Sequence, residues 1–266
     1  MRLCVLISCM HQADCSIVER SNVQCDCVVI NQCDVDKVER FTFKNKFGQN
    51  KECVFIHTTE RGLSKSRNMA INHAPEDCIC LLCDDDETFA DDIEDKISAG
   101  YRRMPHADLI AFSLDRRDLK LGKKYSREDA PLTFRTILNT SSLQITFRKN
   151  RIDALGIRFD EKMGSGTGNG GGEENKFMLD IRKTGGRLFY APECIAVVNP
   201  GESQWFKGYT PHHMQNVGWS SRRSMGTAIG FVYVNYWVLT HRRFYKEDIS
   251  FFRAYINVLK GYFQKR

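Results

Sequence analysis

The chain has 266 residues and a mass of 30.7 kDa, a length that suits one large α/β domain or two small ones. Its composition, 42% hydrophobic and 27% charged, excludes a disordered or collagen-like chain. The sequence has no run of the roughly 20 apolar residues that a transmembrane helix needs. The formal net charge of +6 is modest, and without an RNA-binding aromatic motif it does not indicate a nucleic-acid partner.

Short apolar runs alternate with amphipathic segments in the first half of the chain. We expect buried parallel strands at Leu3–Ser8, Asp26–Asn31, Cys53–His57 and Cys78–Cys83. A helix is predicted at Ser64–Ala74, with Ser64 as its N-cap and Pro75 ending it, and another at Asp91–Met104. This alternation predicts an α/β protein with an open, Rossmann-like and mostly parallel sheet, whose ligands bind beyond the carboxyl ends of the strands.

The second half is less regular. Strands are expected at Ala107–Leu114, Leu143–Phe147 and Arg187–Val198, and a surface loop at residues 116–129. A glycine-dense segment, residues 164–172, leads through two glutamates into a helix at Asn175–Lys183.

The 11 cysteines cannot all pair internally, because their number is odd. Most lie in the apolar runs, where cysteine behaves as a small hydrophobic residue. Cys80 and Cys83 have the spacing of a zinc knuckle, but no second pair accompanies them. We therefore expect free thiols and a reducing, cytoplasmic compartment.

A cluster of carboxylates, Asp84, Asp85 and Asp86, directly follows the predicted strand Cys78–Cys83. Such groups repel one another unless a cation neutralises them, and a hard divalent ion such as Mg²⁺ or Mn²⁺ is the natural partner. Asp84 and Asp86 form an Asp-x-Asp pair whose side chains point to the same side. The alternative is an acidic turn that caps the next helix.

Basic residues gather one βα unit earlier, at the start of the first predicted helix. Arg61, Lys65 and Arg67 near a helix N-terminus form an anion site that suits a diphosphate. A solvated basic helix face is the alternative. Because both clusters fall at strand carboxyl ends, together they predict a site for a metal and a nucleoside diphosphate.

Four motifs in this order and spacing resemble those of glycosyltransferase family 2, bacterial inverting enzymes of the GT-A fold. The motifs are Gly62-Leu-Ser-Lys-Ser-Arg-Asn68, Asp84-Asp-Asp86, Phe159-Asp-Glu-Lys-Met-Gly164 and Gly172-Glu-Glu174. The resemblance covers roughly residues 1–200 and implies a sugar-nucleotide donor and a divalent metal, Mn²⁺ or Mg²⁺.

The resemblance also implies roles for individual residues. Asp86 matches the metal-binding aspartate, and Asp84 lies near the ribose or the metal. It places Ser64, Arg67, Asn68 and Asp84 at the sugar nucleotide, and we expect Arg61 of the basic cluster and Asp85 of the carboxylate cluster to bind there too. The family's usual Pro-x-Tyr-Asn after the first strand is absent, so we expect base recognition to rest on Ser8, Asn31 and Asp34.

The acidic pair after the glycines carries the catalytic base in this family. Inverting transfer needs one carboxylate to deprotonate the acceptor hydroxyl. The resemblance implies Glu174 as this base, because the family pattern often reads Glu-Asp and its second acid is the usual base; Glu173 is the alternative. A purely structural interpretation is a negative charge that offsets the helix dipole. Family members often show a histidine after the last core strand, where this chain has Asn199. His212 and His213 are the candidates to replace this histidine, although adjacent exposed histidines are more often incidental.

The chain end, residues 231–266, interleaves aromatic and basic residues. Its helices either pack on the core or present a surface to anionic lipid at the inner face of the cytoplasmic membrane. We expect a catalytic domain at residues 1–205, with a nucleotide-sugar-binding half at 1–115 and an acceptor half at 116–205, and a helical extension at 206–266.

The resulting hypothesis is a metal-dependent inverting glycosyltransferase acting on a glycan or lipid-linked oligosaccharide, in bacterial surface polysaccharide synthesis. The alternatives are a metal-dependent nucleotidyltransferase and an inactive glycan-binding homologue.

Overall fold

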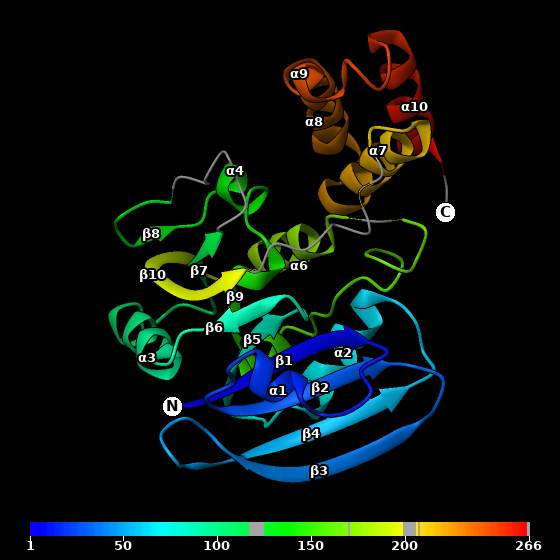
Figure 1. Cartoon of the computed structure of the whole chain (residues 1–266). Coiled ribbons are helices and arrows are strands. Elements are labelled where there is room, and N and C mark those ends of the chain that lie inside the picture. Colours follow the sequence, from blue (N-terminus) through cyan, green and yellow to red (C-terminus); the bar gives the residue numbers. More distant parts are fainter. Residues whose placement is uncertain (117–124, 170, 199–205, 207, 265–266) are drawn as a thin grey trace.

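A single sheet runs through the computed structural model, which describes residues 1–116, 125–169, 171–198, 206 and 208–264. The strand order is β3-β4-β2-β1-β5-β9-β7-β10-β6, with β8 paired to β10 (Figure 1). Strands β4, β2, β1 and β5 are mutually parallel, as are β7 and β10, whereas β3, β6, β8 and β9 run antiparallel to their neighbours. The predicted α/β class with a mostly parallel sheet is therefore confirmed.

The strands are bounded as follows: β1 Arg2–Met10, β2 Asp26–Gln32, β3 Lys37–Lys44, β4 Asn50–Thr58, β5 Cys78–Cys83, β6 Glu87–Phe89, β7 Leu109–Arg116, β8 Ala130–Pro131, β9 Ile145–Arg148 and β10 Leu188–Val198. The α-helices are α1 Ile17–Arg20, α2 Leu63–His73, α3 Ile93–Arg103, α4 Phe134–Ile137, α5 Lys149–Ala154, α6 Glu173–Lys183, α7 Pro211–Met225, α8 Thr227–Thr240, α9 Arg242–Tyr245 and α10 Phe251–Phe263.

Helices cover both faces of the sheet, because the strands bury both faces. In β5 the odd residues, such as Ile79 and Leu81, pack with α1 and α3. The even residues, such as Leu82, pack with α2, α5 and α6. This three-layer arrangement is what the run Cys78–Cys83 predicts, since a strand that is apolar at every position has no face for water.

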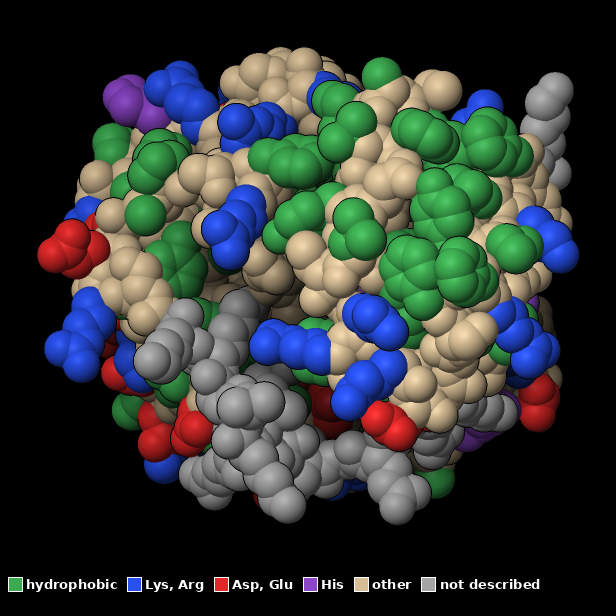
Figure 2. Space-filling view, turned by 90° about the horizontal axis from the view of Figure 1, so that it is seen from above, with side chains coloured by type: hydrophobic (Ala, Val, Ile, Leu, Met, Phe, Trp, Pro, Cys, Tyr) green, Lys and Arg blue, Asp and Glu red, His purple; other side chains and the backbone are tan. Residues whose placement is uncertain are grey.

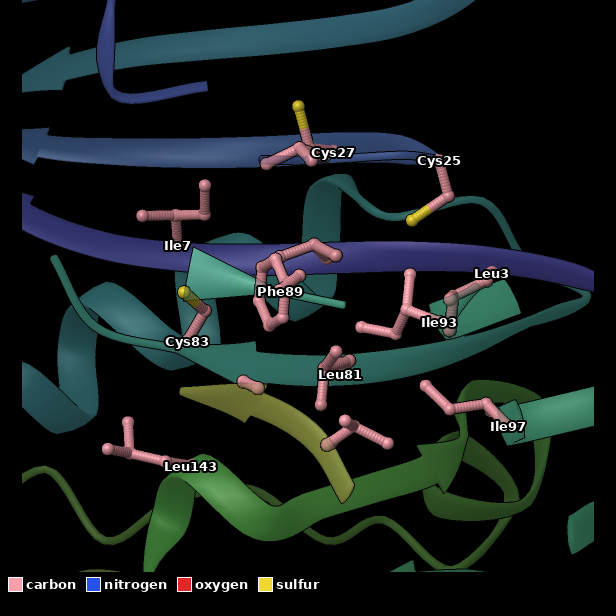
Figure 3. Close-up of a cluster of buried hydrophobic side chains, with 14 of the residues drawn as sticks. Leu3, Ile7, Cys25, Cys27, Leu81, Cys83, Phe89, Ile93, Ile97 and Leu143 are labelled. Atoms are coloured by element: carbon pink, nitrogen blue, oxygen red, sulfur yellow. The ribbon is translucent and has the colours of Figure 1, made fainter. Parts of the chain in front are cut away.

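Cysteines fill parts of both layers as small apolar side chains. Nine of the 11 are buried, and all are free thiols; Cys15 and Cys194 are exposed. Figure 3 shows Cys25, Cys27 and Cys83 among the aliphatic side chains of one layer. Cys80 belongs to the opposite layer from Cys83, so these two thiols do not form half of a zinc knuckle.

Of the strands predicted in the first half, β5 has the predicted bounds and β2 is one residue longer, whereas β1 and β4 extend further in both directions than predicted. The hairpin partner β3 was not predicted, because its residues alternate between exposed and half-buried at the sheet edge and form no apolar run. In β10, Pro192 lies where the pairing with β7 shifts register between Tyr190 and Cys194. Residues 117–124 of the predicted surface loop lie outside the described part of the chain.

In the described part of the chain after β10, four helices form a separate small layer, on the side of the molecule away from β3 and β4 (Figure 1). Helices α7 and α10 approach each other closely because each carries a glycine at the contact. A Cβ atom on Gly218 would overlap the carbonyl oxygen of Val258, and one on Gly261 would overlap that of Gln215. Within the described residues, no helix is both long and apolar enough to cross a bilayer.

Candidate active site

The carboxyl ends of β1, β2, β4 and β5 meet at one edge of the sheet, as parallel strands require. The predicted site residues Ser8, Asn31 and Asp84 lie at or just beyond these ends, and α2 begins there. The structure thus brings the acidic cluster and the basic helix start to the same edge.

The amino terminus of α2 differs from its prediction. Gly62, with a φ of 121°, is the N-cap in place of Ser64, which lies inside the first turn. The N–H of Gly62 donates to Gln32 Oε1 at 2.8 Å, and that of Leu63 donates to the Ser165 carbonyl at 2.9 Å. Two backbone N–H groups of the predicted anion site are therefore hydrogen-bonded within the chain. The side chain of Lys65 is a half-exposed cation at this terminus.

Two side chains of α2 hold the segment that precedes the glycine run. The hydroxyl of Ser64 donates to the Met163 carbonyl at 2.7 Å. The amide of Asn68 exchanges two hydrogen bonds with the backbone of Phe159, at 2.8 and 2.9 Å, and donates a third to Glu161 at 3.0 Å. Since Ser64 and Asn68 are buried, these contacts fix the distance between α2 and the segment from Phe159 to Gly164.

Arg67 joins the two acidic motifs. Its guanidinium is buried and donates to Glu173 Oε1 at 2.9 Å and to Asp84 Oδ1 at 3.2 Å. Burial opposes its charge, but the two carboxylates outweigh that cost and raise the pKa of Arg67. The guanidinium also lies over the Phe159 ring, 5.5 Å from its centroid. Asp84 and Glu173, from motifs 89 residues apart in sequence, are therefore held on one cation.

The carboxylates after β5 have different surroundings. Asp85 and Asp86 are exposed, whereas Asp84 is partly buried, and burial raises its pKa more than Arg67 lowers it. Glu87 starts β6 and is buried, and burial together with the charge of Asp84 raises its pKa well above the usual range. The cluster thus has exposed negative charges at Asp85 and Asp86 and a buried carboxyl group at Glu87.

Glu173 and Glu174 form the first turn of α6, after the left-handed N-cap Gly172. Glu173 is buried on Arg67, whereas Glu174 is half-buried and accepts a hydrogen bond from the Asn175 side chain at 2.8 Å. Burial, followed by repulsion from Glu173, raises the pKa of Glu174 to about 8. Gly164 packs beside this turn, where a Cβ would lie 3.2 Å from Ser64 Oγ and 3.4 Å from Glu173.

The residues predicted for base recognition are spread over the edge. Ser8 is buried and its hydroxyl bonds to that of Ser66 at 2.8 Å. Asn31 is buried and exchanges hydrogen bonds with the backbone of Gln12, which positions the loop after β1. Asp34 is exposed and pairs with Arg61 at 2.7 Å. Arg61 also donates to carbonyls at the ends of β2 and β4, so it fastens two loops together.

The two histidines differ from each other. His212 lies against the glycine run, with Nε2 at 3.1 Å from the Gly168 carbonyl and 3.2 Å from Asn216. His213 packs among Phe206 and Tyr209, and burial lowers its pKa. Asn199, at the family's usual histidine position, lies outside the described residues. Within the described part of the chain, no cluster of three or more His, Cys, Asp or Glu side chains is arranged to hold a metal.

A family model, glycosyl transferase family 2, matches residues 11–164, which is more than half of the chain. The chain belongs to glycosyl transferase family 2. This membership confirms the resemblance carried by the sequence motifs and makes the protein a glycosyltransferase. It favours that activity over the nucleotidyltransferase alternative. No curated protein matches the transferase in sequence.

Solved structures agree on the fold. S. aureus TarS 1-349 in complex with UDP-GlcNAc has a TM-score of 0.64 and 16% identity, over 98% of the transferase and 80% of that chain. The mannosyltransferase PcManGT from Pyrobaculum calidifontis, in complex with GDP-Man and Mn²⁺, has a TM-score of 0.54 and 13% identity, over 98% and 73%. The transferase therefore has the GT-A fold.

Several residues that build the site were not predicted from the sequence. Gln32 and Glu161 bind the α2 segment, and Asp160 pairs with Arg223 of α7 through two hydrogen bonds of 2.5 and 2.8 Å. The only sequence signal was that Asp160 and Glu161 lie inside a family motif, which says nothing of their partners.

Proposed function

We propose that this transferase moves a sugar from a nucleotide donor to a hydroxyl of a glycan or lipid-linked acceptor, with inversion at the anomeric carbon. The observation that carries the proposal is the buried ion-pair chain from Asp84 through Arg67 to Glu173. It joins Asp84 at the end of β5 to Glu173 at the start of α6, which supports one site built from both motifs. Such a site offers donor binding on one side and a base on the other.

Glu174 is the proposed base. Glu173 is buried and committed to Arg67, whereas Glu174 is half-buried and contacts a neutral amide. Its carboxylate takes the proton of the acceptor hydroxyl as the acceptor oxygen bonds to the anomeric carbon. The bond from that carbon to the diphosphate oxygen breaks at the same time, and the nucleoside diphosphate leaves with the electron pair.

The carboxylates after β5 suit a hard divalent cation. Asp86 and Asp84 would supply oxygen ligands at this strand end, and the ligand shell of Mg²⁺ or Mn²⁺ is usually completed by water and substrate phosphate rather than by a protein cage. When bound, the cation stabilises the negative charge of the leaving diphosphate. Asp85, also exposed, extends the negative surface that attracts the cation.

The donor is proposed to lie along the edge from β2 to β5. Asp34 and Arg61 are the accessible pair at the base end, and Lys65 is the cation nearest the phosphates. Five buried residues shape this edge through hydrogen bonds within the protein, and not through polar groups exposed to the donor. They are Ser8, Asn31, Ser64, Arg67 and Asn68. UDP- and GDP-linked sugars, which are bound in TarS and PcManGT, are the first donors to test.

The proposed domain organisation follows the site. Residues 1–115 carry the donor edge, 116–205 carry the base and the acceptor side, and 206–266 form the helical extension. A role in bacterial surface polysaccharide synthesis, at the inner face of the cytoplasmic membrane, fits an acceptor presented on lipid.

A nucleotide-release screen tests the proposal. The protein is incubated with a panel of sugar nucleotides and candidate acceptors, with Mn²⁺, Mg²⁺ or a chelator. We expect release of nucleoside diphosphate, an inverted anomeric linkage in the product, and loss of both with chelator or with Asp86→Ala. Release of pyrophosphate instead would contradict the proposal, as would full transfer in the chelator.

A further inference from the structure

Helix α8 is apolar on its exposed side as well as on its buried side. Gly230, Val234 and Val238 face the small core of the helical extension. On the outer side, four side chains at spacings of three and four residues are each more than half exposed: Ile229, Val232, Tyr236 and Leu239. The helix contains no charged residue. A helix of this kind needs an apolar environment on both sides.

Helix α10 repeats the pattern. Ala254, Val258 and Tyr262 are buried, whereas Phe252, Ile256 and Phe263 are each more than half exposed. Figure 2 shows that hydrophobic side chains gather on the face that carries the C-terminal helices, with Lys and Arg side chains beside them. We call the seven exposed side chains of α8 and α10 the apolar face. Contiguous exposed apolar surface on a protein usually marks an interaction site.

Basic residues border the apolar face. They are Arg242, Arg243, Lys246, Arg253 and Lys260, against two acidic residues, Glu247 and Asp248, in the described stretch from residue 227 to 264. Asp248 is turned to the backbone N–H of Tyr209, at 2.9 Å. Among the described residues, Arg242, Arg243, Arg253 and Lys260 enter no ion pair, so their charge is available to a partner.

We propose that the apolar face is a docking surface for an anionic lipid bilayer. Exposed aliphatic and aromatic side chains enter the boundary between headgroups and acyl chains, and the surrounding Arg and Lys side chains bind the phosphates. Helix α8, with 14 residues, is about 21 Å long at 1.5 Å per residue, too short to cross a hydrocarbon core of about 30 Å. The helix therefore lies along the membrane rather than across it.

The charges favour lipid over a second copy of the chain. In a two-fold dimer the same basic border would meet itself, and like charges would oppose association. An anionic bilayer complements that border instead.

The docking surface is connected rigidly to the active site. Arg223 of α7 binds Asp160 through two hydrogen bonds, next to the Phe159 that Asn68 holds. Lys183 of α6 donates to the Ser224 carbonyl of α7 at 3.1 Å. Membrane docking would thus hold the glutamate pair of α6 at a fixed height above the lipid, which suits a lipid-linked acceptor and deepens the proposed function.

Vesicle flotation with the full chain tests the inference. We expect binding to vesicles of phosphatidylcholine with about 30% of the anionic lipid phosphatidylglycerol, and at least tenfold weaker binding to phosphatidylcholine alone. The double variant Val232→Asp/Leu239→Asp should bind the anionic vesicles at least tenfold more weakly. Phe47→Asp, at an exposed aromatic residue of the β3–β4 turn, is the matched control and should bind as the unmodified protein does.

Equal binding by the double variant and the control would overturn the inference, as would an absence of binding to anionic vesicles. A dimer in solution that the double variant dissociates would also overturn it, since the apolar face would then join two copies. Turnover of a sugar nucleotide with a water-soluble acceptor is measured on the same samples. The double variant should retain this turnover, so a failure of docking and a failure of the proposed function give different results.

Discussion

Replacing Arg67 with methionine should destabilise the protein far more than removing an exposed arginine. The side chain of Arg67 is only 2% exposed and lies between Glu173, at 7%, and Asp84, at 31%. Without the guanidinium, Glu173 becomes a buried charge with no cation beside it. Breaking a buried pair in this way costs about 3–5 kcal/mol, and most of that cost comes from Glu173, because water screens the more exposed Asp84.

Arg103→Met is the matched control. Arg103 also binds two carboxylates, Asp129 and Glu193, each at 2.7 Å, but its side chain is 40% exposed. Its removal should cost about 1 kcal/mol or less. Thermal and urea unfolding of both variants measure the difference, and Arg67→Met should lower the midpoint temperature by about 10 °C, at roughly 2–4 °C per kcal/mol.

A double-mutant cycle shows whether the buried charge is the cause. Once Glu173→Gln has neutralised the glutamate, Arg67→Met should cost at least about 1 kcal/mol less than it does alone. Additivity within about 0.5 kcal/mol would refute the reasoning, as would equal losses in Arg67→Met and Arg103→Met.

Two further predictions concern the base and the helical extension. Because only the deprotonated carboxylate accepts a proton, and the pKa of Glu174 is raised to about 8, kcat/KM for transfer should rise with pH and level off above about 8; a profile that is flat from pH 6 to 9 would contradict this. Gly218→Ala should lower the free energy of unfolding, although alanine normally stabilises a helix by about 1 kcal/mol, because its Cβ would overlap Val258 of α10. Stabilisation in chemical unfolding would contradict the close helix packing.

Local sequence patterns predicted most of the sheet and the edge at which the candidate site residues gather. The run Cys78–Cys83 is a strand with these bounds, because a short, continuously apolar run is typical of a strand buried on both faces. The charged groups that follow it reach the site because parallel strands end at one edge. Three strands were not predicted: β3, because its residues alternate between exposed and half-buried, and β6 and β8, because they have only three and two residues.

Local sequence patterns do not predict which residues the site residues contact. Ser64 was predicted to cap its helix, but its hydroxyl binds Met163, 99 residues further along the chain. Arg67 is predicted to lie by the nucleotide, and its motif does not indicate the two carboxylates, Asp84 and Glu173, that bind it in the structure. Such pairings depend on which loops the fold brings together, and no spacing within a motif encodes them.

The measurement that tests the central claim most directly is sugar transfer by Glu174→Gln, with donor affinity measured on the same protein. Glutamine preserves the shape of the side chain but accepts no proton at neutral pH. We expect the donor Kd to stay within about twofold, and transfer to fall by about 10²–10⁴-fold, as removal of a general base predicts. Transfer at the unmodified rate would show that the base lies elsewhere and would contradict the site described.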